Sequence, residues 1–210
     1  MTETCIKTRV DGGIAVIALD RPDVLNALNS VLMAEMTEAM KRFTAAPDVR
    51  VIVIHGNGRA FSAGFDLKES AAKNYQGLAQ WRSVLEYDFN FLMQFWDCPK
   101  PVIAAVHGFC LAGAFELALS CDVTVAAEGT RFGEPEVRFG SGIVCMLLPW
   151  MTTPKIAKEL LLTGADRVTA RRMHEIGIVN RVVPDGEALK AATELARDLA
   201  AAAPHSVRLT

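Results

Sequence analysis

Short runs of consecutive apolar residues alternate along this chain with longer segments in which apolar residues recur every three or four positions. Continuous apolar runs predict strands that are covered on both faces, and the three- and four-residue spacing predicts amphipathic helices. The predicted strands lie at residues 14–19, 51–54, 102–106 and 123–126. The helical spacing begins at Ser30, which we interpret as an N-cap, and ends before Pro47; it returns over residues 78–96.

The second half of the chain continues this alternation. Residues 107–111 are predicted to form a turn and residues 112–120 a short helix. Beyond Gly142 the pattern predicts several helices, a strand over residues 178–183 and an alanine-rich helix after Pro184. Strands that alternate with helices in this way predict the α/β class, with a largely parallel sheet and binding loops at the strand ends.

Composition and charge exclude several classes of function. The 210 residues are 51% hydrophobic, which suits one large folded domain. Lys and Arg number 22 against 24 Asp and Glu, so the chain has no basic excess with which to bind nucleic acid. No segment predicts a membrane helix and residues 1–7 do not resemble a signal peptide, so we expect a cytoplasmic protein without membrane contacts.

Neither the cysteines nor the histidines predict a metal site. The five cysteines include no Cys-x-x-Cys pair, and the four histidines have no paired spacing. Free thiols in a reducing compartment explain these cysteines better than disulfides do. Cys110 and Cys121 are expected to be small core residues.

Two glycine-containing turns could each present a backbone N–H group to a substrate. Gly113 falls in the first turn of the predicted short helix, where N–H groups lack intrahelical partners. Together with the N–H of Phe65, it would form an oxyanion hole for a carbonyl oxygen that gains negative charge. Two carboxylates, Glu116 and Glu136, lie twenty residues apart and could divide acid and base roles between them.

Several segments, in their order and spacing, resemble the crotonase (enoyl-CoA hydratase/isomerase) family. They are residues 21–28, 61–69, 100–108, 112–122, 132–136 and 162–179. The resemblance implies an α/β fold of the ClpP/crotonase type, a spiral of ββα units. It further implies a core domain over residues 1–184, with residues 185–210 as the start of a C-terminal helical region that is largely missing.

The resemblance also implies an activity on acyl-CoA thioesters. Glu116 and Glu136 match the two hydratase carboxylates, so the implied reaction is syn addition of water to a trans-2-enoyl-CoA, which gives a 3-hydroxyacyl-CoA. Glu116 would deprotonate the water and Glu136 would deliver a proton to C2, while Phe65 and Gly113 match the oxyanion hole. The positions implied to bind the coenzyme A ester are Val24, Leu25, Ala63, Asp66, Leu67 and Lys68. The family implies no metal and no cofactor beyond the coenzyme A of the substrate, and a homotrimer or dimer of trimers.

The chain departs from the family pattern at three places. Ala112-Gly113-Ala114 replaces a run of three glycines but keeps the central one, so we expect the oxyanion hole to survive. Phe65 replaces a small residue, and its side chain could narrow the acyl pocket. Residues 140–149 replace a glycine-rich loop with apolar bulk, which suggests a different acyl specificity.

Other functions remain open at this stage. An isomerase, a dehydratase-type lyase or a hydrolase of the same family would share these motifs, and so would a non-catalytic acyl-CoA-binding protein. A serine hydrolase is disfavoured, because neither Ser62 nor Ser141 lies in a Gly-x-Ser-x-Gly sequence. We interpret Glu86 and Glu134 as solvated or paired carboxylates without a chemical role.

Overall fold

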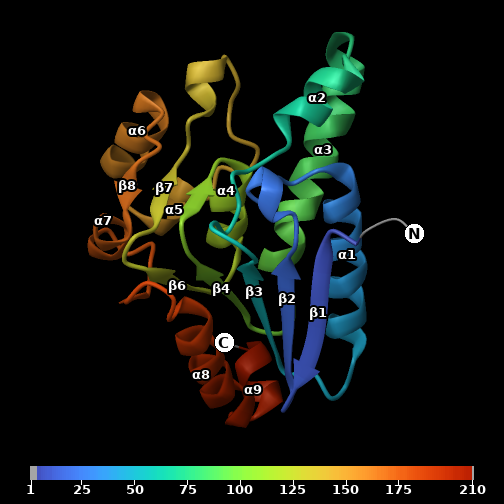
Figure 1. The fold of residues 1–210 in the computed structure, drawn as a ribbon, viewed down its shortest axis with the longest axis vertical. Helices are drawn as coiled ribbons and strands as arrows, with labels where there is room; N and C mark the ends of the chain where they lie inside the picture. Colours follow the sequence, from blue (N-terminus) through green and yellow to red (C-terminus); the bar gives the residue numbers. More distant parts are fainter. Residues whose placement is uncertain (1–3, 210) are drawn as a thin grey trace.

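The computed structural model describes residues 4–209, which form an α/β fold with two sheets (Figure 1). The larger sheet has the strand order β1-β2-β3-β4-β6-β9, and the smaller has the order β5-β7-β8. The large sheet contains β1 (Ile6–Asp11), β2 (Ile14–Leu19), β3 (Val51–Gly56), β4 (Val102–Val106), β6 (Val123–Ala127) and β9 (Arg181–Val183). The small sheet contains β5 (Phe109–Leu111), β7 (Arg131–Gly133) and β8 (Val168–Thr169). The predicted α/β class is confirmed.

The large sheet is parallel from β2 to β9, as predicted. Every residue of β2 and β4 is buried, because helices cover both faces of the sheet. β1 is the exception, since it pairs antiparallel with β2 at the edge and five of its six residues are exposed. Because β1 consists mostly of polar, exposed residues, it forms no continuous apolar run and was not predicted.

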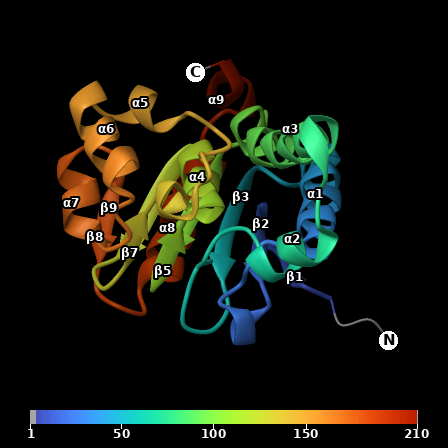
Figure 2. The same cartoon turned by 90° about the horizontal axis from the view of Figure 1, so that it is seen from above.

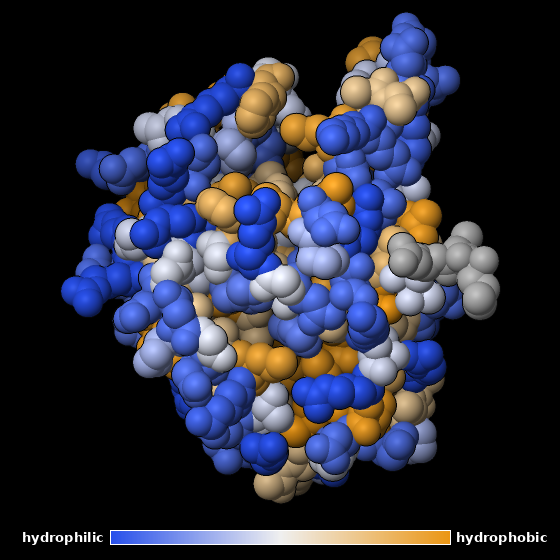
Figure 3. Space-filling view, viewed as in Figure 1, coloured by the Kyte–Doolittle hydropathy of each residue, from blue (hydrophilic) through white to orange (hydrophobic). Residues whose placement is uncertain are grey.

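Helices follow most of the strands. They are α1 (Ser30–Ala45), α2 (Leu67–Lys73), α3 (Gly77–Trp96), α4 (Gly113–Ser120), α5 (Leu148–Met151), α6 (Pro154–Thr163), α7 (Ala170–Glu175), α8 (Ala188–Ala201) and α9 (Pro204–Leu209), with 3-10 turns at Pro22–Val24 and Glu136–Phe139. Viewed from above, α1, α2 and α3 lie on one side of the molecule, and α5, α6 and α7 lie on the other (Figure 2). In space-filling view, a notch separates the projecting α2–α3 end from the α6 side (Figure 3).

Two apolar clusters hold these layers together. On one face of the sheet, α1, α3 and α4 contribute Met36, Phe95 and Phe115 to the larger cluster, and all three are fully buried. On the other face, Ala192 and Ala196 of α8 pack among the strand residues. Because these alanines are small and four residues apart, α8 lies close against the sheet. The domain division between residues 184 and 185 stays a prediction.

Three local predictions differ from the structure. The N-cap of α1 is Asn29, not Ser30, because the Asn29 side chain accepts a hydrogen bond from the Leu32 N–H at 3.0 Å. Residues 109–111 of the predicted turn form β5, which pairs with β7 and is too short to give an apolar run. The predicted strand at 178–183 is confined to β9, because Ile178 and Val179 instead close the end of α7.

The described residues contain no helix that is long and apolar enough to cross a membrane. Cys110 and Cys121 are buried core residues, as predicted.

Candidate active site

The turn at residues 63–65 lies directly against the start of α4. Gly64 has a φ of +93°, and a Cβ added to it would lie 2.6 Å from the Cβ of Ala112 and 3.2 Å from the backbone nitrogen of Gly113. Real Cβ atoms do not approach other atoms that closely, so only glycine fits at position 64. The structure therefore brings together the two glycine turns that the sequence singles out.

The N–H groups of Phe65 and Gly113 are both available to a ligand. Within residues 4–209 neither donates a hydrogen bond, whereas the neighbouring Ala112 N–H donates to the Gly133 carbonyl at 2.8 Å. Gly113 is the first residue of α4, so its N–H has no intrahelical acceptor and lies at the positive end of the helix dipole. This arrangement suits an oxyanion hole, and the assignment of these two residues to one stays a prediction.

The ring of Phe65 covers the Cα atom of Gly113. A Cβ added to Gly113 would lie 2.3 Å from the Phe65 ring, so a side chain at position 113 would displace the ring. Phe65 also lines a cavity of about 760 Å³ between α1, α2 and α3. Other residues that line this cavity include Leu28, Met33, Tyr75, Tyr87 and Asp88. Phe65 thus contacts both Gly113 and a cavity large enough for an acyl group.

Glu116 extends from α4 into the interior of the molecule. Its residue surface is 1% exposed, and its Oε1 accepts a hydrogen bond from the Val144 N–H at 2.7 Å. The Cys145 N–H lies close to the same carboxylate. Burial raises the pKa of Glu116 to about 8, although these two N–H groups act in the opposite direction. Residues 140–149 therefore hold Glu116 through their backbone.

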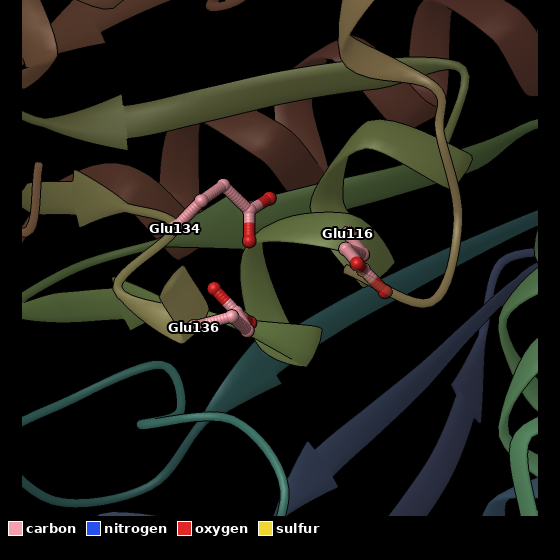
Figure 4. A group of neighbouring side chains, drawn as sticks. All are labelled: Glu116, Glu134 and Glu136. Atoms are coloured by element: carbon pink, nitrogen blue, oxygen red, sulfur yellow. The ribbon is translucent and has the colours of Figure 1, made fainter. Parts of the chain in front are cut away.

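Glu136 and Glu134 approach Glu116 from the segment that follows β7. Their carboxylates point toward each other in Figure 4, and one oxygen from each of the three glutamates lies within 4.8 Å of the others. Glu136 is half-buried and begins the 3-10 turn Glu136–Phe139. The structure thus unites Glu116 and Glu136 in one site, as a two-carboxylate mechanism requires.

Glu134 was wrongly interpreted as solvated or paired. Its residue surface is 2% exposed and it forms no ion pair with any described residue, because β7 and the segment around Ala165 enclose it. Its backbone N–H donates to the Ala165 carbonyl at 3.0 Å. The residues next to Glu134 in the sequence do not predict this burial, because the segment around Ala165 that packs against it is 31 residues away. Glu86, by contrast, is exposed and paired with Arg82, as predicted.

Three buried carboxylates in one small site hold protons that isolated carboxylates would lose. The Oε2 atoms of Glu116, Glu134 and Glu136 have no hydrogen-bond partner among residues 4–209. Burial raises the pKa of Glu134 well above its ordinary value, and burial also raises the pKa of Glu136. Because the three groups lie close together, the protonation of each affects the pKa of the others, and such a cluster can divide acid and base roles between its members. A small cation could also bridge oxygens at this spacing.

The residues predicted to bind coenzyme A lie on two segments joined by backbone hydrogen bonds. The Ala63 N–H donates to the Leu25 carbonyl at 3.0 Å, which places the turn that contains Val24 beside residues 63–68. Val24, Leu67 and Lys68 are exposed, as contacts with a large ligand require. Asp66 is already engaged, because it caps α2 and pairs with Arg21 at 3.1 Å. Contacts with coenzyme A stay a prediction for all six positions.

Asn26 supports this arrangement and was not identified from the sequence. It is fully buried, and its side-chain nitrogen donates to the carbonyls of Asn57, Ala60 and Phe61. Its side-chain oxygen accepts from the Arg21 N–H at 2.8 Å. These bonds fix the turn at 21–26 to the loop that leads to Phe65. A signal was present in the sequence, because asparagine is one of the few residues that readily adopt the positive φ of 53° seen here.

Comparisons with known proteins agree with this geometry. Residues 9–210 match the family described as enoyl-CoA hydratase/isomerase. The crystal structure of an enoyl-CoA hydratase/isomerase from Xanthobacter autotrophicus Py2 is similar, with a TM-score of 0.96 and 49% identity over 99% of this chain and 77% of that one. The crystal structure of enoyl-CoA hydratase from Bacillus anthracis has a TM-score of 0.91 and 31% identity, over 98% of this chain and 80% of that one. The carnitinyl-CoA dehydratase of Salmonella typhi is 40% identical over 212 residues, or 99% of this chain and 78% of the dehydratase.

Proposed function

The chain belongs to the enoyl-CoA hydratase/isomerase family, and from that premise we propose that it is an enoyl-CoA hydratase, which adds water to a trans-2-enoyl-CoA. Its fold is the crotonase-like fold of its solved relatives, which confirms the fold expected from the motifs. The observation that carries the proposal is the close pair Glu116 and Glu136, with Glu116 on the helix whose first residue, Gly113, has a free N–H beside the turn that contains Phe65. An acyl-CoA thioester would place its carbonyl oxygen at the N–H groups of Phe65 and Gly113.

In the proposed mechanism, each carboxyl group moves one proton. Glu116 acts in its ionised form, which is the minor form at neutral pH because its pKa is about 8, and it accepts a proton from water as the water oxygen bonds to C3 of the substrate. The double-bond electrons move toward the thioester, and its oxygen is stabilised by the N–H groups of Phe65 and Gly113. Glu136 then gives its proton to C2, which yields the 3-hydroxyacyl-CoA. The reaction is redox-neutral, so the only cofactor moiety that we propose is the coenzyme A of the substrate.

The test is turnover of crotonyl-CoA and of a longer 2-enoyl-CoA by the full chain. Loss of the conjugated enoyl-thioester absorbance, with a product heavier by one water, is the expected result. Glu116→Gln serves as the inactive control, and Glu86→Gln as the matched active control, because Glu86 lies on the exposed surface. A wild-type chain that binds these esters without turnover would support a non-catalytic acyl-CoA binder instead. The same material would give the oligomeric state by sedimentation, for which we expect a trimer or a dimer of trimers.

A second candidate is dehydration of a 3-hydroxyacyl-CoA whose acyl group carries a positive charge. Carnitinyl-CoA dehydratases are among the relatives, and the carnitinyl group is a quaternary ammonium. The cavity beside Phe65 contains the half-buried Asp88 together with Tyr75 and Tyr87, a combination that suits a cation. Burial raises the pKa of Asp88 to about 6, so it is largely ionised at neutral pH. Faster turnover of a cationic substrate than of crotonyl-CoA, lost in Asp88→Asn, would favour this activity.

A further inference from the structure

Glu134 is the one carboxylate of the buried cluster to which the proposed mechanism gives no role. Its carboxylate points toward Glu136 in Figure 4, and its Oε2 has no hydrogen-bond partner although it is fully buried. The titratable groups that act on it across the described residues are Glu116 of α4, Glu136, Cys110 of β5 and Cys145. All of these groups are neutral or negative, so nothing there compensates a negative charge on Glu134.

The surroundings of Glu134 favour its neutral form over its ionised form. An ionised carboxylate loses its hydration on burial, and two neighbouring carboxylates would repel it. A protonated carboxyl group avoids both costs and gains an O–H that can donate a hydrogen bond. Burial accordingly raises the pKa of Glu134 well above its ordinary value. A carboxylic acid kept neutral in this way acts as a hydrogen-bond donor at neutral pH.

We propose that Glu134 is a positioning residue that keeps its proton and donates its O–H to the carboxylate that Glu136 becomes during turnover. The inference rests on the proposed hydratase function, and it adds a residue that the two-carboxylate mechanism lacks. The proton balance is unchanged, because C2 receives its proton from Glu136, Glu116 takes one from water, and Glu134 retains its own. The donated hydrogen bond stabilises the ionised form of Glu136 and orients its carboxylate.

The backbone around Glu134 is built to hold this orientation. The Glu134 N–H donates to the Ala165 carbonyl, and Gly133 packs so closely on Ala165 that an added Cβ would lie 2.0 Å from that carbonyl oxygen. Pro135 fixes φ immediately after Glu134. The segment from β7 to Glu136 is therefore anchored on both sides of Glu134, so its side chain has little freedom to turn away from Glu136.

Two substitutions separate a donor role from a merely structural one. In Glu134→Gln the amide keeps the shape and can still donate a hydrogen bond, whereas in Glu134→Leu the donor is lost. We expect Glu134→Gln to keep kcat for crotonyl-CoA within about threefold of wild type, and Glu134→Leu to lower kcat roughly 10- to 100-fold, since a hydrogen bond to an ionised group is lost. We expect KM to be nearly unchanged in both variants, because the buried side chain of Glu134 offers almost no surface to coenzyme A. Thermal unfolding would establish that both variants are folded. Glu86→Gln controls for the loss of a carboxylate elsewhere in the chain.

Other outcomes would overturn the proposal. If kcat falls as far in Glu134→Gln as in Glu134→Leu, the site needs a carboxylate charge or a proton carrier at this position. If Glu134→Leu keeps the wild-type kcat, the residue has no part in turnover. If a chelator abolishes wild-type activity and Mg²⁺ restores it, the three carboxylates hold a cation.

A spectroscopic measurement does not depend on turnover. The infrared difference between wild type and Glu134→Gln at neutral pH should show the loss of one protonated carboxyl group. Loss of an ionised carboxylate band would refute the proposal even if the chain has no hydratase activity. Failure of the proposed function would instead leave this spectroscopic result unchanged, so the two failures are distinguishable.

Discussion

Replacement of Gly113 by proline removes one hydrogen-bond donor and leaves most of the site in place. Proline is tolerated at the first position of a helix, where the N–H has no intrahelical acceptor, so α4 itself should still form. The lost N–H is one of the two that we assign to the thioester oxygen. Removal of an oxyanion-hole donor typically lowers kcat by about 10²–10³, or roughly 3–4 kcal/mol of transition-state stabilisation.

Proline also adds side-chain atoms, and Gly113→Ala controls for them. A Cβ at position 113 would lie 2.3 Å from the Phe65 ring, and overpacking of this kind costs about 1–3 kcal/mol of folding stability. Alanine adds the same Cβ but keeps the N–H. The difference in kcat between the two variants therefore measures the effect of the lost N–H. In both variants, Phe65→Ala would remove the contact between the added Cβ and the Phe65 ring.

The assay is the steady-state hydration of crotonyl-CoA by Gly113→Ala and Gly113→Pro, each with and without Phe65→Ala. We expect kcat of the proline variant to be about 10²–10³ lower than that of the alanine variant in both backgrounds. Circular dichroism and thermal unfolding would establish that each variant is folded. Equal kcat values in folded alanine and proline variants would refute the assignment of this N–H to the oxyanion hole.

Four further predictions concern the catalytic rate, the pH dependence of stability, the folding of the site and the acyl pocket. Glu116→Gln and Glu136→Gln should each lower kcat by about 10²–10⁴ with little change in KM, and unchanged kcat in either would remove that residue from the mechanism. Burial raises the pKa of Glu116 from 4.5 to about 8, so the folded protein favours the protonated carboxyl group. The contribution of this proton to the free energy of unfolding is therefore fully present below pH 4.5 and is lost as the pH rises through 8. In urea unfolding, the free energy of unfolding of the wild type should fall with pH in this window more steeply than that of Glu116→Gln, by about 1.4 kcal/mol per pH unit, and equal slopes in the two proteins would assign the proton elsewhere. Asn26→Ala should lower the free energy of unfolding by about 2–4 kcal/mol, because buried carbonyls lose their donor; a loss below 0.5 kcal/mol would show that water replaces it. Phe65→Ala should lower KM for a longer 2-enoyl-CoA more than KM for crotonyl-CoA, and an unchanged ratio would place the acyl chain outside the cavity.

The parts of the fold that are buried on both faces were predictable from the sequence. β2, β3, β4 and β6 each consist largely of consecutive apolar residues, because no face of these strands meets water. β1 lies at the sheet edge with mostly polar, exposed side chains, so its position depends on pairing with β2 rather than on its own composition. Pairing between distant segments leaves no local pattern in a single sequence.

In the candidate site, too, some residues could be predicted from local motifs, whereas others depend on contacts between distant segments. Glu116, Glu136 and Gly113 stand in ordered motifs, so their roles could be predicted before their geometry was known. The burial of Glu134 depends on the approach of Ala165, and the role of Asn26 depends on three carbonyls more than thirty residues away. These contacts follow from the tertiary structure and could not be inferred from the neighbouring residues.

Residues 140–149 contact Glu116 in a way that does not depend on their side chains. The hydrogen bond from this segment to Glu116 comes from the backbone N–H of Val144, which every residue except proline can supply. A change of side chains can therefore preserve the orientation of Glu116, provided that the path of the backbone is kept. The side chains of the same segment are free to differ, and Val144 is one of those that remain partly exposed. None of these residues lines the cavity beside Phe65, so we expect substitutions here that keep the backbone path to change neither the contact with Glu116 nor the wall of that cavity.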